Sequence, residues 1–553
     1  MAAPDIPGIK RAGLPVDLER LAREGDGWLT PEDRYALKTR GICTQLQDGV
    51  FMVRVRIPGG VLPTEQARHL ARLSRSYGSD WLHLTTRQNI ELHWIEPHQI
   101  PRLFDGLTAA GLSTDSACGH TLRNIMCSEE AGVALDEPFD CFPDAKLVSD
   151  AIVARSRQLN CELPSRINIA FGGSARCRDD AKINDAAFVS VLGEATGEPG
   201  YELYAGGSLG KAPRLAILLT PFLPRHDVMA AAEALVEVFV AHGDFDHPAR
   251  GRMKFCIEAL GEDGFRAAWE QAFAAARCRP QPATPPIEVL AEVDKAAILA
   301  SRPVGGWSAG IRPQRTRGLV SVVVDVPLGD TRGAELELLA DLADRHGDGH
   351  LVLGRDQDVV LRNIDVAAVP QIRAALVERG LHPVGEAHVA RVRACTGSAV
   401  CALGISPAPQ TGWDLIPTPG LGRNSSLRVH VSGCPNSCAQ HQVGDLGLAG
   451  TKVRLGGETR LGYQLFLGAD VERGLLGEVV GRLAAEDAGA AIDAVVGAWE
   501  ATRQNGESLG ATVRRFGLDA FAAHLEAQLA ERWASGAEAE IGEVVIPSDV
   551  VPA

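Results

Sequence analysis

Four cysteines, arranged as two close pairs, are the residues whose types and spacing most directly indicate chemistry. Cys395 and Cys401 lie in "ACTGSAVC", and Cys434 and Cys438 lie in "GCPNSC". Four thiolates from two loops can enclose a metal centre. Zinc sites favour gaps of about two to four residues in each pair, so the five-residue gap in the first pair favours a bulkier iron–sulfur cluster. Packing of free buried thiols is the alternative interpretation.

Three arginines and an asparagine form a second set of candidates. Arg87 follows two threonines at the expected end of a strand, and Arg123 lies in "TLRN". Arg166 and Asn168 occupy alternate positions of an expected strand, which would place both side chains on one face. Taken singly, each could equally belong to a solvent-exposed face.

Two further pairs of basic residues could bind an anionic cofactor. Arg54 and Arg56 alternate in a strand and therefore share a face. Arg250 and Lys254 are four residues apart and could share a helix face. The alternative for both pairs is a solvated run of charge.

An internal repeat supplies the elements that would position these residues. "WLHLTTRQNIELHWI" from Trp81 aligns with "HLVLGRDQDVVLRNI" from His350, so that Gln88 falls on Gln357, at a constant offset of 269 residues. Both copies predict the order β-α-β-β-α, beginning with the alternating strands "VFMVRVRI" and "LVSVVVDV". Two such α+β modules are expected to pair into one pseudo-twofold domain.

The segments that follow each copy also resemble one another, more weakly. "SRINIAFGGS" parallels "LRVHVSGCPN" in a register that places Arg166 on Arg428, Asn168 on His430 and Gly172 on Cys434. The second copy therefore holds cysteines where the first has none. We interpret the chain as a duplication in which one copy kept a site that the other lost.

Length and composition limit the class of protein. A chain of 553 residues is too long for one hydrophobic core, so several domains are expected. A net charge of −15 argues against nucleic acid as a partner. No membrane-length apolar run or export signal is present, and twelve cysteines are too few for a disulfide framework, so we expect a cytoplasmic protein with reduced thiols. The expected segments are 1–45 (N-terminal extension), 46–115 (first half-module), 116–277 (substrate and cofactor domain), 278–312 (proline-rich linker), 313–384 (second half-module), 385–535 (cysteine-containing domain with C-terminal helices) and 536–553 (tail).

The motifs together resemble the sirohaem- and iron–sulfur-dependent nitrite and sulfite reductase family. The resemblance is carried by "ACTGSAVC" with "GCPNSCAQHQVGDLGLAG", by "FMVRVRIPGG", by "LTTRQNIELHW" and by "TLRNIMC", and the duplicated architecture matches nearly the whole chain. It implies an α+β fold in which two ferredoxin-like half-modules form one domain beside two related α+β cofactor-binding domains. It also implies that the four cysteines bind a 4Fe–4S cluster and that Cys438 is shared with the iron of sirohaem.

The same resemblance assigns roles to the remaining candidates. It places Arg87, Arg123, Arg166 and Asn168 on the open side of the sirohaem, around the substrate anion. "GGSLGKAPR" from Gly206 fails as a phosphate loop because Ala205 and Ala212 replace its required residues, and its glycines would instead allow close approach to the cofactor. The cofactor-binding residues implied are Arg54, Arg56, Gln88, Asn124, Gly206, Gly207, Arg250, Lys254, Asn436 and Cys438.

The chain departs from the family at two pocket positions, where sulfite reductases carry two lysines and nitrite reductases a lysine and an asparagine. Here Arg166 and Asn168 stand there, and the neutral asparagine suits monoanionic nitrite better than sulfite. Arginine is a poor proton donor, so water or another acid must supply protons.

We therefore expect six-electron reduction of nitrite to ammonia. No dinucleotide fingerprint follows a predicted strand, so we expect a separate donor such as ferredoxin to supply the electrons. We also expect a monomer that binds neither nucleic acid nor a membrane. The alternatives are sulfite reduction to sulfide on the same scaffold, a precorrin-3B synthase-like enzyme and a non-catalytic iron–sulfur sensor.

Overall fold

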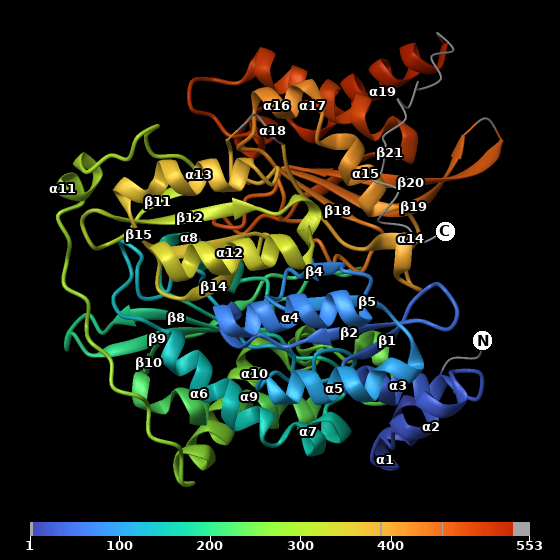
Figure 1. Ribbon diagram of the computed structural model, residues 1–553, viewed down its shortest axis with the longest axis vertical. Helices are drawn as coiled ribbons and strands as arrows, with labels where there is room; N and C mark the ends of the chain where they lie inside the picture. Colours follow the sequence, from blue (N-terminus) through green and yellow to red (C-terminus); the bar gives the residue numbers. More distant parts are fainter. Residues whose placement is uncertain (1–3, 387–389, 456, 535–553) are drawn as a thin grey trace.

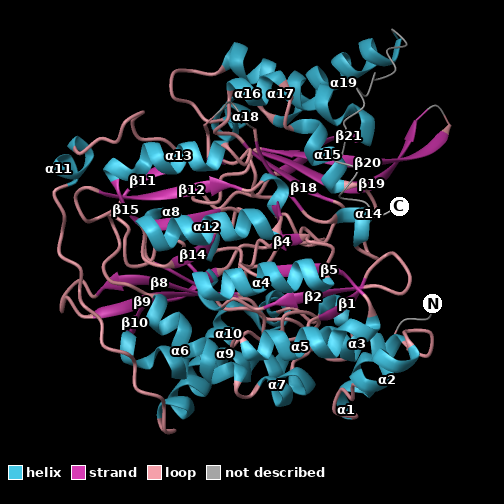
Figure 2. Ribbon diagram, in the orientation of Figure 1, coloured by secondary structure: helices cyan, strands magenta, loops and turns pink. Residues whose placement is uncertain are grey.

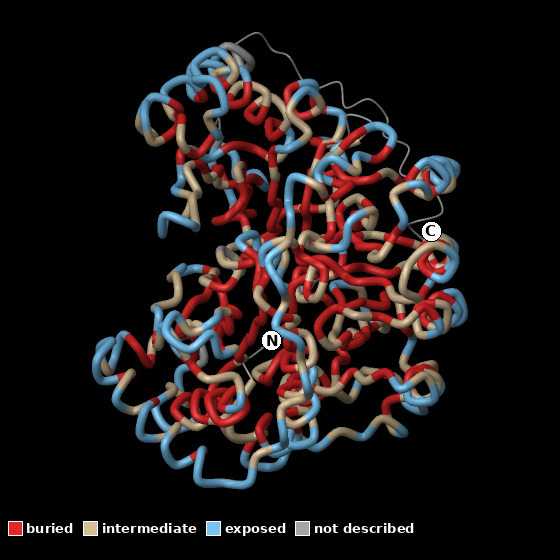
Figure 3. Tube along the Cα trace, turned by 90° about the vertical axis from the view of Figure 1, so that its left-hand side faces the viewer, coloured by how far each residue is buried: buried red, intermediate tan, exposed pale blue. Residues whose placement is uncertain are grey.

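The computed structural model describes residues 4–386, 390–455 and 457–534, so the predicted tail at 536–553 lies outside the described residues. Two half-modules occupy the centre of the molecule, and a larger α/β layer lies at each end (Figure 1). The sheets form the buried interior, and the helices cover them with partly exposed faces (Figures 2 and 3). Within the described ranges, no helix is long and apolar enough to cross a bilayer.

Each half-module has the predicted order, extended by short edge strands. The strands of the two halves bury alternate apolar residues such as Val53 and Leu92 in one shared core. The first half comprises β1 (Ile42–Thr44), β2 (Phe51–Val55), β3 (Val61–Pro63), α4 (Thr64–Tyr77), β4 (Leu82–Leu84), β5 (Ile90–Ile95) and α5 (Ile100–Ala109). The second comprises β11 (Ile311–Pro313), β12 (Leu319–Asp325), β13 (Asp330–Thr331), α12 (Gly333–His346), β14 (His350–Leu353), β15 (Val359–Asp365), α13 (Val369–Val377) and β16 (His382–Pro383).

The halves exchange edge strands, which joins them into one domain. Strand β13 of the second half pairs with β4 of the first, and β3 of the first half pairs with β14 of the second. Helices α4 and α12 lie side by side in Figure 1, where Arg68 donates to Asp341 and Asp344 at 2.6 Å. The predicted pairing of two ferredoxin-like halves is confirmed.

The repeat is visible in single residues. Gln88 and Gln357 both adopt the left-handed backbone conformation, with φ of 55° and 65°. The Nε2 of Gln88 donates to the Leu353 carbonyl at 2.8 Å, and the Nε2 of Gln357 donates to the Leu84 carbonyl at 2.8 Å. Each glutamine thus reaches from its own half into the other, in the predicted register.

The two end domains share one sheet arrangement. In each, three neighbouring strands run parallel and two further strands are antiparallel. The first contains β6 (Met126–Cys127), β7 (Ile169–Gly172), β8 (Ala186–Leu192), β9 (Pro199–Ala205), β10 (Ile217–Pro224), α6 (Phe142–Val153), α7 (Ser156–Glu162), α8 (Ala175–Ala181), α9 (Val228–His242) and α10 (Met253–Arg277). The second contains β17 (Arg391–Ala394), β18 (Arg428–Ser432), β19 (Leu446–Leu455), β20 (Glu458–Leu467), β21 (Glu478–Ala484), α14 (Gly397–Val400), α15 (Ala408–Leu415), α16 (Pro419–Arg423), α17 (Ala488–Thr502), α18 (Leu509–Phe516) and α19 (Leu518–Ala534).

The remaining helices lie outside these layers. They are α1 (Ile6–Arg11), α2 (Leu18–Glu24) and α3 (Pro31–Thr39) in the N-terminal extension and α11 (Lys295–Ala300) in the connection between the two halves.

The predicted register between the end domains is wrong by two residues. The backbone N–H of Asn168 donates to Asp185 at 2.9 Å, and that of Arg428 donates to Asp445 at 2.9 Å. Asn168 therefore corresponds to Arg428, and neither the match of Arg166 with Arg428 nor that of Asn168 with His430 holds. A shift of two keeps every strand residue on its own face, so alternation in the sequence cannot detect it.

The corrected register also moves the counterparts of the cysteines. Ser174, rather than Gly172, follows β7 where Cys434 follows β18. The N–H of Ser128 donates to Phe171 at 2.9 Å, as the N–H of Cys395 donates to Val431 at 3.1 Å. Serines thus stand in the first copy where two of the cysteines stand in the second.

Candidate active site

The four predicted cysteines come from two loops at the ends of adjacent parallel strands. Cys395 directly follows β17, Cys401 follows α14, and Cys434 and Cys438 follow β18. Burial first, and then the neighbouring Cys438 thiol, raise the pKa values of the thiols of Cys395, Cys401 and Cys434. The four cysteines therefore lie on neighbouring loops, and three of their thiols respond to the charge of the fourth.

Backbone N–H groups point at these sulfurs. Gly433 donates to the Sγ of Cys395 at 3.2 Å, and backbone donors also reach Cys401 and Cys434. A Cβ atom on Gly433 would lie 2.6 Å from the Cα of Gly397, so only glycine lets the two loops meet. Such donors stabilise thiolates bound to iron, so this set fits a cluster. Among the described residues, no group of three or more His, Cys, Asp or Glu is arranged for a single metal ion.

The predicted anion-binding residues meet in front of Cys438. Arg87 lies in the turn between β4 and β5, and its Nε donates to the Oδ1 of Asn168 at 3.1 Å. Arg166 and Asn168 lie just before β7, and Asn168 is buried. Arg123 donates to the carbonyls of Ala117 and Gly119, both at 2.9 Å. The structure brings these four residues close together, and we refer to the group as the anion pocket.

The pocket is strongly cationic. Burial first, and then repulsion by neighbouring guanidinium groups, lower the pKa of Arg87 to about 10 and that of Arg166 to about 9. Burial likewise lowers the pKa of Arg123 to about 10, so all three stay charged at neutral pH. The buried Nε of Arg166 has no hydrogen-bond partner within the described chain. Mutually repelling guanidinium groups, one of them with an unpartnered buried N–H, favour binding of an anion.

Cys438 joins the pocket to the cluster loop. Its charge acts on Arg87 and Arg166 as well as on the other three cysteines. The Oγ1 of Thr86, next to Arg87, donates to the Cys438 carbonyl at 2.9 Å. Cys438 is exposed although the residues around it are buried. Its charge therefore links the cysteine loops to the arginines of the anion pocket.

Arg252 belongs to this pocket, and sequence reasoning missed it. It is 9% exposed and binds Asp185 through its Nε at 3.2 Å and its Nη2 at 2.8 Å. Its charge contributes to the lowered pKa of Arg166. Asp185 lies directly before the buried strand β8, where a carboxylate needs a cationic partner. This acidic residue was the sequence signal that could have pointed to Arg252.

The sequence singled out Arg250 and Lys254 from the same stretch, and the prediction that they share a helix face is wrong. Helix α10 begins at Met253, so Arg250 precedes it; this arginine is exposed and pairs with Glu258 at 2.7 Å. Lys254 is buried and donates to the Ala212 carbonyl. Burial lowers the pKa of Lys254 to about 8.

The other predicted cofactor residues surround the pocket. Arg54 and Arg56 share a face as predicted, and they reach the carbonyls of Ala117 at 3.3 Å and of Arg123 at 3.4 Å. Asn124 donates to the Arg87 carbonyl at 3.1 Å and so supports its turn. The amide of Gln88 is already used in backbone hydrogen bonds.

The glycine loop packs against protein atoms. A Cβ atom on Gly206 would lie 2.2 Å from Ile257, and one on Gly207 would lie 2.2 Å from the Lys182 carbonyl. The same loop passes near the exposed Asn436, since a Cβ atom on Gly210 would lie 3.9 Å from the Asn436 carbonyl oxygen. Contact of these residues with a cofactor stays a prediction.

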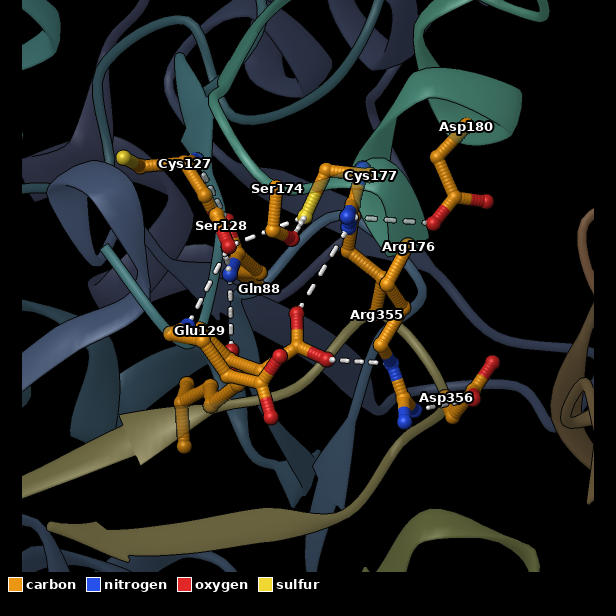
Figure 4. Close-up of polar contacts among 12 residues, drawn as sticks. Gln88, Cys127, Ser128, Glu129, Ser174, Arg176, Cys177, Asp180, Arg355 and Asp356 are labelled. Atoms are coloured by element: carbon orange, nitrogen blue, oxygen red, sulfur yellow. Dashed lines mark hydrogen bonds and ion pairs between the residues drawn. The ribbon is translucent and has the colours of Figure 1, made fainter. Parts of the chain in front are cut away.

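Figure 4 shows the pseudo-symmetric counterpart of the site, where polar side chains bond to one another. The Cys177 thiol donates a hydrogen bond to the Ser128 hydroxyl at 2.9 Å. It accepts one from the Ser174 hydroxyl at 3.3 Å. Arg355, at the position equivalent to Thr86, pairs with Asp180 at 3.0 Å, and Asp356 replaces Arg87. Acidic side chains pair with the arginines there, so among the described residues this counterpart lacks the excess of positive charge found around Arg87, Arg123 and Arg166.

A duplicated α+β fold with four gathered thiols beside a cationic pocket defines a redox enzyme class, and comparisons identify its family. The model of the nitrite/sulfite reductase ferredoxin-like half domain matches residues 44–110 and 312–379, and that of the nitrite and sulphite reductase 4Fe-4S domain matches 118–276 and 425–533. The chain belongs to the nitrite and sulfite reductase family. Membership implies a 4Fe–4S cluster and sirohaem as cofactors.

Similar proteins of both substrate types are known. The chain is 32% identical to a ferredoxin–nitrite reductase of Synechococcus elongatus over 84% of this chain and 89% of that protein. It is 29% identical to sulfite reductase (ferredoxin) 1 of Mycolicibacterium paratuberculosis over 92% and 94%. The solved structure of the Mycobacterium tuberculosis NirA protein matches with a TM-score of 0.77 and 27% identity, covering 94% of this chain and 96% of that one. The chain is accordingly a nitrite or sulfite reductase.

Proposed function

We propose that this protein reduces nitrite to ammonia with electrons from a ferredoxin-like donor. The observation that carries the proposal is the neutral Asn168 among the guanidinium groups of the pocket, bonded to Arg87 at 3.1 Å. Nitrite carries one negative charge, whereas sulfite is substantially dianionic near neutral pH. An amide in place of a cation weakens attraction for the dianion more than for the monoanion.

The chain's residues have separate tasks in this proposal. Cys395, Cys401, Cys434 and Cys438 would hold the cluster, with Cys438 on the side of the sirohaem. When bound, the two cofactors would pass the donor's six electrons one at a time to the substrate. Arg87, Arg123 and Arg166 orient the oxygens of the anion and stabilise the charge that develops as N–O bonds break. Asn168 accepts a hydrogen bond from Arg87 and so holds it in place, and its amide N–H groups are donors for the anion.

Electron supply from ferredoxin is part of the proposal. Relatives that use it include the Synechococcus elongatus enzyme named above. Ferredoxins are generally acidic and this chain carries a net charge of −15, so docking requires a local basic patch.

Sulfite reduction is the second candidate, because one observation favours it. Arg252 adds a fourth guanidinium group at the pocket, although Asp185 neutralises part of its charge. A pocket that retains this charge could accept a dianion. The cationic pocket itself argues against a purely sensing iron–sulfur protein.

Steady-state turnover of the two anions side by side tests the proposal. The holoenzyme would be assayed with reduced ferredoxin, and again with a reduced viologen dye to remove any effect of the donor. We expect kcat/KM for nitrite to exceed that for sulfite by at least about tenfold, which corresponds to about 1.4 kcal/mol in the barrier. A larger kcat/KM for sulfite with both donors would overturn it.

A further inference from the structure

Helix α1 of the N-terminal extension carries an almost completely buried lysine. Lys10 is 2% exposed, and its Nζ lies 5.6 Å from the centre of the Phe245 ring. Burial lowers the pKa of Lys10 to about 8, so the ammonium group is mainly charged at pH 7. Among the described residues, no carboxylate forms an ion pair with it. Burial of a charge without an opposite partner costs free energy, so stability alone does not account for this lysine.

The ammonium group joins two backbone segments. Its Nζ donates to the Leu163 carbonyl at the end of α7, and it donates to the His120 carbonyl at 3.4 Å. His120 lies three residues before Arg123. Leu163 lies three residues before Arg166. Lys10 therefore bridges the two segments just before each of them supplies a guanidinium group to the anion pocket.

The two segments pair with each other directly after this bridge. Leu122 and Ile167 form a parallel β-bridge. The Ile167 N–H donates to the Thr121 carbonyl at 3.1 Å, and the Arg123 N–H donates to the Ile167 carbonyl at 3.0 Å. The segments then continue as the paired strands β6 and β7. The relative position of Arg123 and Arg166 therefore depends on how the two segments are held at their start.

Helix α1 is itself fixed to the rest of the extension. The carboxylate of Asp5 accepts from the Gly8 N–H at 2.9 Å and caps the helix. The Asp5 N–H donates to Glu32 on α3 at 2.8 Å. Helix α3 also meets the loop before Arg123, since the Ser116 N–H donates to the carbonyl of the last α3 residue at 2.9 Å. The lysine thus acts from a helix whose own position is defined.

We propose that Lys10 is a positioning residue of the anion pocket. It holds the segments of Arg123 and Arg166 at a fixed spacing, so that both guanidinium groups can bind one anion. Without it, the segments would separate at their start and the two arginines would bind the anion less strongly. This inference rests on the anion pocket of the proposed function, but not on which anion is reduced.

Equilibrium binding of anions to the holoenzyme tests this role. Nitrite and sulfite are titrated separately, and the change in visible absorbance of the bound cofactors gives Kd for the loaded molecules alone. Lys10→Met keeps the apolar stem of the side chain but removes its charge and its N–H donors. We expect Kd for both anions to rise by at least about fivefold, because two binding groups are displaced. Lys10→Gln, with N–H donors on a shorter side chain, is judged by the same criterion if Lys10→Met does not retain its cofactors.

Two variants of the same extension serve as controls. Arg11→Met removes the neighbouring cation of α1, which is exposed, and should leave Kd unchanged. Asp17→Ala removes the cap of α2, where the carboxylate accepts from the Arg20 N–H at 2.8 Å. It should lower stability without changing Kd. The controls separate the position of Lys10 from the loss of a charge and from a weaker extension.

Backbone hydrogen exchange is a readout that needs no anion. In Lys10→Met, peptides covering 119–128 and 163–171 should exchange faster than in Asp17→Ala. Unchanged exchange there, or an unchanged Kd for both anions, would overturn the proposal. A rise in Kd that Asp17→Ala matches would also overturn it, because the lysine would then have only a structural role. Failure of the proposed function would appear separately, as a larger kcat/KM for sulfite in the unmodified protein.

Discussion

The Nε of Arg87 donates to the side-chain oxygen of Asn168 at 3.1 Å, so the neutral residue of the pocket is fixed by one of its cations. Asn168→Lys would place a second cation against Arg87 and add a positive charge where the anion binds. We expect the ratio of kcat/KM for sulfite to that for nitrite to rise by about tenfold, because the added charge favours the dianion. Steady-state assays with both substrates measure it, and Asn168→Gln should leave the ratio unchanged. An unchanged ratio in the lysine variant would remove the charge argument.

Asp185 is expected to contribute much more to stability than its counterpart Asp445. Asp185 is completely buried and accepts hydrogen bonds from Arg252 and from the Asn168 backbone. Asp185→Ala leaves a buried guanidinium group unpaired, so the free energy of unfolding should fall by about 3 to 5 kcal/mol. Asp445→Ala is the matched control, with an expected loss of about 1 kcal/mol because that carboxylate is 22% exposed. Urea denaturation measures both, and equal losses would contradict the prediction.

Gln88 and Gln357 are expected to stabilise the joint between the halves equally. Each donates an amide N–H across the pseudo-twofold axis at 2.8 Å. Replacing either by alanine leaves buried carbonyl groups unpaired, at a cost of about 1 to 3 kcal/mol. Thermal unfolding checks this, and the sirohaem content of the purified variants tests whether Gln88 also contacts the cofactor. Loss of sirohaem in Gln88→Ala alone would support that contact.

Glu137 should make the fold less stable as the pH rises. Burial first, and then the charge of Asp140, raise the pKa of the Glu137 carboxyl to about 8, from 4.5. Between these values the folded chain keeps a proton that the unfolded chain loses, so stability falls as pH rises through this window and the loss is complete above about pH 8. Glu137→Gln removes the titration. The variant should gain up to about 5 kcal/mol over the unmodified protein between pH 5 and 8.5.

Urea midpoints of the two proteins at several pH values measure this difference. Asp136→Asn, which removes a neighbouring carboxylate that accepts from the Ala175 backbone at the surface, serves as a control for the loss of one negative charge. A stability difference for Glu137→Gln that did not grow with pH would contradict the assignment.

The fold and the cysteine group were predictable because their signals are local or repeated. The alignment of Gln88 with Gln357 located both half-modules, and both residues adopt the same rare backbone conformation. The spacing of Cys395 and Cys401 already favoured a cluster over zinc. Neither inference required knowledge of how distant segments pack.

What the sequence did not reveal depends on tertiary packing. Arg252 resembles its neighbour Arg250 in sequence, and only the buried position of Asp185 distinguishes them. The exchanged strands β3 and β13 contain three and two residues, too few to show an alternating pattern.

Strand exchange also determines how late in synthesis the first sheet can be completed. Leu82 on β4 pairs with Thr331 on β13, which emerges from the ribosome about 250 residues later. At roughly 5 to 20 residues per second, the edge of the first sheet stays uncovered for about 12 to 50 seconds. An open edge of this kind can pair with another nascent chain. Completion of the first sheet is therefore a post-translational or late co-translational event, and slowing translation after residue 110 should increase aggregation of newly made chains.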